Sequence, residues 1–492
     1  MHAHPSIAMK RRREMDRPSG LYLDGAWRDG PRAAVTDRYR FEAIAEVVEA
    51  STGDVERAID GAARAARHPL KPAQRARILD AVADVLEARG SEIVDDYMAE
   101  TGFTRADGEN ELRRAIRIYR LSAHEAIRIA GEEVPVQAAP GGEHRLAFTV
   151  RVPVGVVVAI APFNAPLSTV AHKVGPAIAA GNAVVLKPAE KTPLSSIHLV
   201  QAVHEAGAPD GLLQLVCGPG RVLGDALVGD PRVRFYTFTG STGVGRRIAA
   251  RSGLARTQLE LGSNSASIVA ADADVERVAA AVITAGYRKA GQVCTSVQRL
   301  LVARERLDDL VDALAPQVEE LVAGDPRDPS TRVGPLIDPR EAERAASWVD
   351  AARGAARTVV GGARSGAVLS PALVVEPEPS AQLLSDEIFA PVVSVVPIDD
   401  VDHGVRMVND GPYGLQAGLF TSDLEVAFRA FRTLHVGGVM VNDTSSYHAD
   451  EMPYGGVKES GHGQEGPRYA VHDMTEPRLI VLNLDGKGPA TT

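Results

Sequence analysis

The side chain in this sequence best suited to covalent chemistry is that of Cys294, one of two cysteines. It lies in Ala290-Gly-Gln-Val-Cys-Thr-Ser296, between a helical stretch and an apolar run. A free thiol has a pKa of about 8.5, but its thiolate is a strong nucleophile, and a nearby base increases the ionised fraction. A single cysteine is also commonly just a small buried hydrophobe. Cys217, which ends the apolar run 213–216, fits that simpler role.

A second chemical signal is a strand followed by a loop of small residues and a helix. The run 235–238 leads into Thr239-Gly-Ser-Thr-Gly-Val-Gly245, which lets the backbone approach a ligand and leaves helix N–H groups facing an anion. The run 184–186 leads into Lys187-Pro-Ala-Glu190. A carboxylate at a strand end can accept hydrogen bonds from ribose hydroxyls and repels a 2′-phosphate. A surface salt bridge is an equally good interpretation of Lys187 or Glu190 taken singly.

A third pattern, Gly461-His-Gly-Gln-Glu-Gly466, matches the GxGxxG dinucleotide fingerprint letter for letter. That fingerprint indicates a dinucleotide site only where it lies between an apolar strand and a helix and an acidic residue follows about 20 positions further on. No apolar run precedes this hexapeptide, and Pro467 follows it. We therefore expect a loop here and not a dinucleotide site.

The hydrophobic pattern predicts the elements that position these residues. Residues 52–130 have apolar positions at helical spacing, which predicts a helical layer. Between about 153 and 262, continuous apolar runs alternate with helical segments, which indicates a parallel sheet that binds ligands at the carboxyl ends of its strands. A second region of the same kind follows. Strands are expected at residues 156–160, 183–186, 213–216 and 235–238, and then at 266–269, 299–302, 392–396, 417–420 and 439–442.

Two further segments, residues 145–152 and 478–484, alternate apolar and polar side chains and are expected to pair as an edge sheet. An unpaired apolar edge favours aggregation, and assembly removes it. We therefore expect a homodimer or a homotetramer.

The composition argues against several function classes. A formal net charge of −10 and a pI of about 5.8 argue against a nucleic-acid partner, which normally needs a basic surface. The longest apolar stretch, residues 152–162, is half the length of a membrane helix. Two cysteines 77 positions apart form neither a disulfide framework nor a CxxC metal motif. We expect a cytoplasmic protein without a metal site or membrane segment, and a disordered tail over residues 1–20, despite the basic cluster at 10–13.

Seven blocks, in order, resemble the aldehyde dehydrogenase superfamily, and the resemblance extends from about residue 20 to 484. They are Ala161-Pro-Phe-Asn164-Ala-Pro, Lys187-Pro-Ala-Glu190, Phe238-Thr-Gly-Ser241, Leu259-Glu260-Leu-Gly262, Gly291-Gln-Val-Cys294, Glu387-Ile-Phe389-Ala-Pro and Pro453-Tyr-Gly-Gly-Val-Lys458-Glu-Ser-Gly. Ser263 and Phe163 depart from the family's usual glycine and tryptophan. Both departures occur in a subgroup resembling lactaldehyde, glycolaldehyde, non-phosphorylating glyceraldehyde-phosphate and phosphonoaldehyde dehydrogenases.

The resemblance implies that Cys294 attacks an aldehyde and that Asn164, with the backbone N–H of Cys294, holds the oxyanion. Hydride then passes to NAD, and Glu260 activates the water that hydrolyses the thioester, which argues against acyl transfer to CoA. The cofactor is expected to be NAD, with NADP as the alternative, because the charge of Glu190 disfavours a 2′-phosphate. The implied cofactor-binding residues are Ile160, Phe163, Lys187, Glu190, Gly220, Gly224, Phe238, Ser241, Val244, Leu261, Gly262, Glu387 and Phe389.

Several positions that line an apolar funnel in relatives acting on fatty or aromatic aldehydes are polar here. Arg288 and His172 replace aromatic residues, and Arg114 matches an arginine that relatives use to hold a phosphate or phosphonate. Guanidinium groups suit phosphonate, phosphate or carboxylate geometry, although a solvated helix residue is the alternative for each arginine. Val293 is a contrary feature, because several phosphate-handling relatives carry an arginine there. The expected substrate residues are Arg114, His172, Arg288, Thr295, Ser446 and His448.

The substrate is therefore expected to be a small anionic aldehyde, with a phosphono, phospho or carboxy group. Lactaldehyde, glycolaldehyde and succinic semialdehyde are the alternatives. A catalytically silent binding protein of the same fold is the alternative from another class.

The expected fold class is α/β, with a Rossmann-like NAD-binding domain, a second α/β catalytic domain and a small β extension for oligomerisation. Residues 21–130 and 153–260 are expected to form the NAD-binding domain, and residues 261–450 the catalytic domain. Residues 131–152 and 470–492 are the expected oligomerisation strands, and residues 451–469 are expected to return to the active site.

Overall fold

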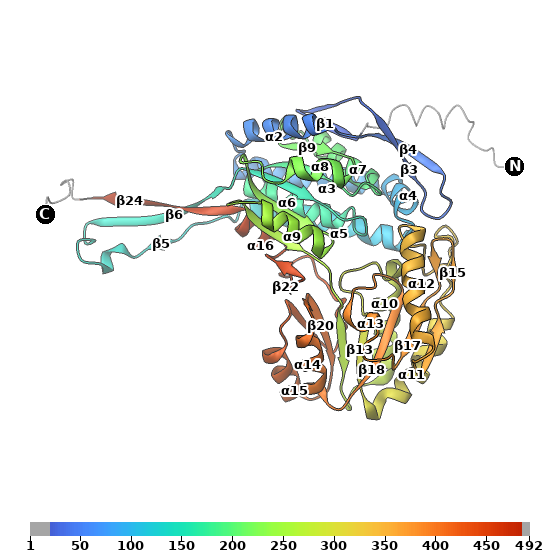
Figure 1. Cartoon of the computed structure of the whole chain (residues 1–492). Coiled ribbons are helices and arrows are strands. Elements are labelled where there is room, and N and C mark those ends of the chain that lie inside the picture. The colour runs from blue at the N-terminus through green and yellow to red at the C-terminus, as the bar shows by residue number, and fades with distance from the viewer. Residues whose placement is uncertain (1–19, 485–492) are drawn as a thin grey trace.

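The structure, a computed structural model, describes residues 20–484. They form two α/β lobes and a long three-stranded sheet that extends away from both (Figure 1). The expected tail before Gly20 and the last eight residues of the expected oligomerisation segment, 485–492, lie outside the described residues.

The first lobe is built on an eight-stranded sheet whose five central strands are parallel. The central strand of the five is apolar along its whole length, and most residues of the others are buried, because helices cover both faces of the sheet. In spatial order the strands are β2 (Ala26–Trp27), β1 (Leu21–Leu23), β9 (Leu213–Val216), β8 (Ala183–Lys187), β7 (Val156–Ile160), β10 (Val233–Thr239), β11 (Arg256–Glu260) and β23 (Gly461–His462).

The helices that cover the first sheet include the predicted helical layer. They are α2 (Thr52–Ala66), α3 (Pro72–Ala88), α4 (Gly90–Thr101), α5 (Arg105–Ala126), α6 (Ser168–Ala180), α7 (Leu194–Glu205), α8 (Gly220–Leu227), α9 (Thr242–Arg251) and α16 (Pro467–Asp473). Helices α2 and α5 each begin with a capping box, at Ser51 and Thr104. In each box the hydroxyl accepts a hydrogen bond from the backbone N–H three residues later, and the carboxylate of that later residue accepts from the backbone N–H of the capping residue.

The second lobe has a seven-stranded sheet that is parallel except for one edge strand. Its strands, in spatial order, are β14 (Thr358–Gly361), β17 (Ala372–Val375), β18 (Val392–Ile398), β13 (Arg299–Ala303), β12 (Ala266–Val269), β20 (Gln416–Phe420) and β21 (Gly438–Val441). Its helices are α10 (Val275–Tyr287), η2 (Arg288–Gly291), α11 (Arg304–Glu319), α12 (Pro339–Arg353), α13 (Gln382–Ser385), α14 (Val401–Asp410) and α15 (Leu424–Thr433).

The projecting sheet joins segments that are far apart in the sequence (Figure 1). Strand β6 (Arg145–Pro153) pairs antiparallel with β24 (Thr475–Asn483) over nine residue pairs, and β5 (Glu133–Val134) and η1 (Val136–Ala138) lie along its other side. Three two-stranded sheets complete the fold: β3 (Arg32–Thr36) with β4 (Ala43–Val48), β15 (Arg364–Ser365) with β16 (Val368–Leu369), and β19 (Tyr413–Gly414) with β22 (Val457–Lys458). The predicted pairing of residues 145–152 with 478–484 is therefore confirmed.

The predicted α/β fold and its two sheets are confirmed, but strands β11, β14 and β17 were not predicted from the sequence. Strands β1 and β2 extend the first sheet at its edge, although their short sequences carry no clear period. The GxGxxG hexapeptide is not simply a loop: Gly461 pairs antiparallel with Glu260 on β11. A side chain at Gly461 would lie 1.9 Å from the Leu259 carbonyl oxygen, so this glycine is required by close strand packing. No helix within residues 20–484 is long and apolar enough to span a bilayer.

Candidate active site

A cavity of about 620 Å³ lies where β7, β8, β10 and β11 end, and residues of both lobes line it. Ligands bind at this end of parallel sheets because loops and helix N-termini converge there. The cavity collects most of the predicted site residues. They are Arg114, Phe163, Asn164, His172, Glu190, Ser241, Glu260, Leu261, Gly262, Arg288, Cys294, Thr295, Glu387, Phe389 and His448.

The backbone before Cys294 is held in an unusual conformation. Lys289, Ala290 and Gly291 have φ angles of 50°, 55° and 67°, all in the left-handed region. A residue other than glycine stays in this strained backbone conformation only where the surrounding structure holds it there. A Cβ atom at Gly291 would lie 2.0 Å from the Ala390 carbonyl oxygen, so only glycine fits there. The turn brings Cys294 from the end of α10 to the cavity wall.

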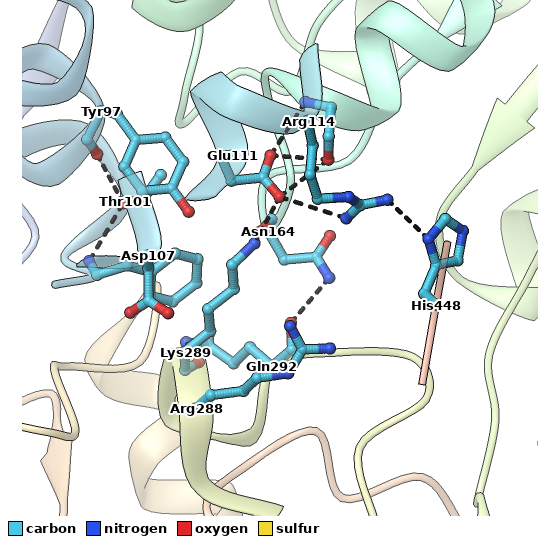
Figure 2. Close-up of polar contacts among 12 residues, drawn as sticks. Tyr97, Thr101, Asp107, Glu111, Arg114, Asn164, Arg288, Lys289, Gln292 and His448 are labelled. Carbon is cyan, nitrogen blue, oxygen red and sulfur yellow. Dashed lines mark hydrogen bonds and ion pairs between the residues drawn. The ribbon is translucent and has the colours of Figure 1, made fainter. Parts of the chain in front are cut away.

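A buried ion pair anchors this turn (Figure 2). Lys289 Nζ donates to Glu111 Oε1 on α5 and to the Asn164 carbonyl oxygen, both at 2.9 Å. Burial alone raises the pKa of Glu111, but the charges of Lys289 and Arg114 outweigh it and keep this pKa below its usual value. Lys289 thus ties the cysteine loop to the loop that carries Asn164.

Asn164 is in place to hold an oxyanion. Its side-chain Nδ2 donates to the Gln292 carbonyl oxygen at 2.8 Å (Figure 2), which fixes the orientation of the amide in the cavity that Cys294 also lines. An amide nitrogen has two N–H groups, so one N–H remains to donate to a ligand in the cavity. Donors fixed in advance on a developing negative charge are an effective means of lowering a reaction barrier.

Cys294 Sγ lies 2.8 Å from the hydroxyl oxygen of Tyr454. Burial raises the pKa of Cys294 to about 12, the nearby Glu260 adds to the rise, and the hydrogen bond with Tyr454 opposes it. The cavity therefore does not itself stabilise the thiolate, and the Tyr454 hydroxyl favours it.

Glu260, the last residue of β11, is a buried carboxyl group with unused hydrogen-bonding capacity. Within residues 20–484, neither of its carboxyl oxygens has a hydrogen-bond partner. Burial and then the charge of Glu465 raise its pKa well above the usual value. Glu465 itself stays ionised because Lys173 Nζ donates to it at 2.9 Å. A carboxyl group with a raised pKa suits a general base that works near neutral pH.

Two guanidinium groups, those of Arg114 and Arg288, lie in the same cavity wall, but they differ in their hydrogen-bond partners. Arg114 donates to Asp450 Oδ1 from Nη2 at 2.8 Å and from Nε at 3.0 Å, and its Nη2 also contacts His448 Nδ1 at 3.0 Å. Arg288 Nη2 donates to the Ser446 hydroxyl at 2.9 Å and has no carboxylate within 4.0 Å among the described residues. Arg288 is therefore the guanidinium group whose charge is left for a ligand.

The other half of the cavity fits a dinucleotide. Ser241 precedes α9 in an extended conformation, so the first N–H groups of that helix face the opening. Glu387 Oε1 accepts from the Ser263 N–H at 2.9 Å, and burial raises the pKa of Glu387 to about 7. A Cβ atom at Gly262 would lie 2.8 Å from the other oxygen, Glu387 Oε2, so glycine keeps the space beside that carboxylate open.

The comparisons with known proteins agree with this geometry. The model of the aldehyde dehydrogenase family matches residues 27–480. The chain belongs to the aldehyde dehydrogenase family. It is accordingly an NAD(P)-dependent oxidoreductase that acts on an aldehyde, and the resemblance noted in the sequence is confirmed.

Relatives with several substrates match over nearly the whole chain. The 3-sulfolactaldehyde dehydrogenase of Priestia aryabhattai is 44% identical over 94% of this chain and 98% of its own length. The lactaldehyde dehydrogenase of Methanococcus vannielii is 33% identical over 94% of this chain and all of its own. The crystal structure of NADP-dependent glyceraldehyde-3-phosphate dehydrogenase from Bacillus halodurans, complexed with NADP, has a TM-score of 0.90 and 34% identity, covering 95% of this chain and 99% of its own.

Some predicted residues of this aldehyde dehydrogenase do not line the cavity. The Lys187 ammonium group is buried and donates to the Pro188 carbonyl oxygen, and Phe238 packs in the core beneath the sheet. Ser446 lies behind Arg288 and contacts its guanidinium group. The remaining residues outside the lining are Ile160, Gly220, Gly224 and Val244.

Sequence reasoning missed several charged residues around the cavity. Two of them left a signal: Glu111 falls on the apolar stripe of α5 with Ala115 and Ile118, and Lys173 lies within the mostly apolar helix α6. A charge on a buried helix face needs a partner. Asp450 and Glu465 lie in irregular segments without a period, so only the fold reveals them.

We expect Tyr454→Phe to slow alkylation of Cys294 by iodoacetamide about tenfold or more at pH 8, because the thiolate loses a hydrogen bond from a neutral donor. Peptide mass spectrometry after timed alkylation measures the rate at Cys294. Tyr447→Phe is the matched control, since Tyr447 lies half-exposed on the neighbouring loop. An unchanged or faster rate in Tyr454→Phe, with Tyr447→Phe at the wild-type rate, would contradict this role.

Proposed function

We propose that this enzyme oxidises a small aldehyde with an anionic head group to the acid, using NAD. The observation that carries the proposal is Arg288, a guanidinium group in the wall of the cavity that also contains Cys294, with no carboxylate partner among residues 20–484. A buried charge is costly unless it is paired, and an anionic substrate provides the missing partner. The 3-sulfolactaldehyde dehydrogenase relative, whose substrate carries a sulfonate, supports the same substrate class.

In the proposed reaction, Cys294 loses its proton to solvent and the thiolate Sγ attacks the carbonyl carbon, so that a carbon–sulfur bond forms as the carbonyl π electrons move to oxygen. The Asn164 amide donates to that oxygen. NAD, when bound, supplies the acceptor for the hydride that leaves this carbon, and a thioester remains. Glu260 then takes a proton from water, the hydroxide attacks the thioester, and the carbon–sulfur bond breaks to release the acid.

The preference for NAD rests on Glu190. Its side chain is exposed at the rim of the cavity, just after β8, and its negative charge disfavours the 2′-phosphate of NADP. Relatives of similar fold include an NADP complex, so the ratio of kcat/KM for the two cofactors is the measurement that tests this part of the proposal.

We also propose that the enzyme is a homo-oligomer joined through β24. Leu479, Ile480, Val481 and Leu482 on this strand are each more than a third exposed. The second lobe exposes Phe428 and Phe431 on α15. Apolar surface of this extent on a projecting strand favours association.

The experiment that tests the substrate class compares NADH formation from 3-sulfolactaldehyde, succinic semialdehyde and lactaldehyde by the wild-type enzyme and by Arg288→Met. We expect Arg288→Met to lower kcat/KM for the two anionic aldehydes about 30- to 1000-fold, the effect of removing a partner from a buried charge pair. The value for lactaldehyde is expected to change less than about threefold, within the usual effect of a substitution that removes no specific contact.

Arg113→Met is the control, because Arg113 lies exposed on the same helix as Arg114. Equal losses for charged and neutral aldehydes in Arg288→Met would overturn the anionic substrate class. Faster turnover of lactaldehyde than of either anion by the wild-type enzyme would do so as well.

A further inference from the structure

We propose that Asp450 limits the positive charge of the anion subsite, so that the enzyme selects a head group with one negative charge, such as a sulfonate or carboxylate, over a phosphate dianion. The subsite is defined by Arg114, Arg288, Lys289 and Glu111 in the cavity wall, with Asp450 behind Arg114. This inference rests on the proposed function and adds a selection by charge to it.

Asp450 is committed to Arg114. Its Oδ1 accepts two hydrogen bonds from that guanidinium group, and His172 Nε2 lies 3.2 Å from the same oxygen. The side chain is only 5% exposed. Burial alone raises the pKa of Asp450, but the hydrogen bonds from His172 and Arg114 and the charge of Arg114 outweigh it and hold this pKa well below its usual range. Asp450 is therefore ionised and offsets the charge of Arg114.

Lys289 is neutralised in the same way by Glu111, at 2.9 Å on the other side of Arg114 (Figure 2). Figure 2 shows the resulting row of alternating contacts, from Lys289 through Glu111 and Arg114 to His448. Lys289 and Arg114 in this row each have a carboxylate partner. The neighbouring Arg288 does not: its hydrogen-bond partner within residues 20–484 is the neutral Ser446 hydroxyl.

The two histidines do not change this balance. Burial and the charge of Arg114 lower the pKa of His448 well below the usual value, so it is neutral. His172 Nδ1 is buried with no hydrogen-bond partner among the described residues. A protonated imidazole would leave an N–H donor unpaired there, which is costly, so we take His172 as neutral too.

Three cations and two carboxylates therefore leave one positive charge. Asp107, which caps α5 and does not line the cavity, adds a more distant negative charge. A head group with a single negative charge makes this region neutral. A phosphate dianion leaves an uncompensated negative charge beside Asp450 and Glu111, in a place where burial makes charge interactions strong.

The first test is Asp450→Asn, which keeps an oxygen to accept from Arg114 and removes the charge. The two substrates compared are 3-sulfolactaldehyde and glyceraldehyde 3-phosphate, which are three-carbon aldehydes with different head groups. We expect the ratio of kcat/KM for the phosphate to that for the sulfonate to rise about tenfold or more in Asp450→Asn at pH 8. The control is Glu451→Gln, since Glu451 is the exposed neighbour that pairs with Arg117. An unchanged or lower ratio would overturn the proposal.

The second test uses the wild-type enzyme and so does not depend on how a variant folds. Methyl phosphate and methanesulfonate are compared as competitive inhibitors between pH 5 and 8. A phosphate monoester loses its second proton with a pKa of about 6, whereas the sulfonate stays a monoanion. We expect the inhibition constant of methyl phosphate, divided by that of methanesulfonate, to rise about tenfold across this range. Titration of protein groups that affects both inhibitors equally cancels in the ratio.

The outcomes separate the two proposals. A constant or falling ratio, with both anions inhibiting and Arg288→Met weakening both, would overturn the selection by charge and leave the anionic substrate class standing. No inhibition by either anion, together with unchanged selectivity in Arg288→Met, would overturn the substrate class and with it the selection by charge.

Discussion

Replacing Cys294 by alanine is expected to abolish aldehyde-dependent NADH formation, with a loss on the order of 10⁶-fold, the scale measured when a covalent nucleophile is removed. The reason is that, in the proposed mechanism, alanine removes the atom that bonds to the substrate and leaves the other residues of the cavity wall in place. Stopped-flow absorbance of NADH with 3-sulfolactaldehyde and lactaldehyde measures the loss. Turnover by Cys294→Ala within a few-fold of the wild-type rate would contradict the mechanism and favour a noncovalent route.

Cys217→Ala is the matched control for this variant. Cys217 is the other cysteine; it is buried at the end of β9, and burial raises its pKa to about 12, as it does for Cys294. What separates the two thiols is therefore the cavity, the Asn164 amide and the Tyr454 hydroxyl. Cys217→Ala is expected to keep NADH formation near the wild-type rate.

Glu260→Gln is expected to slow steady-state turnover about 10²- to 10⁴-fold, the usual contribution of a general base, while one equivalent of NADH still forms rapidly. The amide cannot take a proton from water, so the thioester accumulates. The attack by Cys294 is not expected to slow, because the charge of Glu260 raises the pKa of that thiol and its removal favours the thiolate. The wild-type kcat is also expected to fall with decreasing pH as Glu260 becomes protonated, at a pH above the usual carboxyl range, because its pKa is raised.

A rapid-mixing experiment that counts NADH per active site measures the burst. Glu276→Gln, an exposed change on the outer side of α10, is expected to behave as the wild type. Loss of the burst in Glu260→Gln would instead place this residue in the first half of the reaction, and an unchanged steady-state rate would remove it from the mechanism.

Most of the strands that carry the site were predictable because a parallel sheet covered on both faces has an unusual signature. The run 156–160 is β7 residue for residue, and 213–216 is β9. Continuous apolar runs mark such strands, and the residues that follow them lie at their carboxyl ends by geometry. This is why Asn164 and Ser241, which follow β7 and β10, were placed at that edge from the hydrophobic pattern. The strand that carries Glu260, β11, is polar in its first half and was not predicted, so Glu260 was identified by the family resemblance alone.

The charge balance of the substrate end was not predictable in the same way. The sequence suggested that Arg114 and Arg288 act together on an anion. The fold pairs Arg114 with Asp450, which is 336 positions away, and leaves Arg288 with a hydroxyl partner. Long-range ion pairs between a helix and an irregular segment carry no local periodicity, so only tertiary structure distinguishes the two arginines.

The most direct test of the covalent mechanism is intact-mass spectrometry of Glu260→Gln after brief mixing with NAD and 3-sulfolactaldehyde. The mechanism predicts that the protein gains the mass of one acyl group, that peptide mapping locates it on Cys294, and that hydroxylamine removes it as expected for a thioester. An NADH burst without an adduct, or an adduct on Cys217 instead of Cys294, would contradict it.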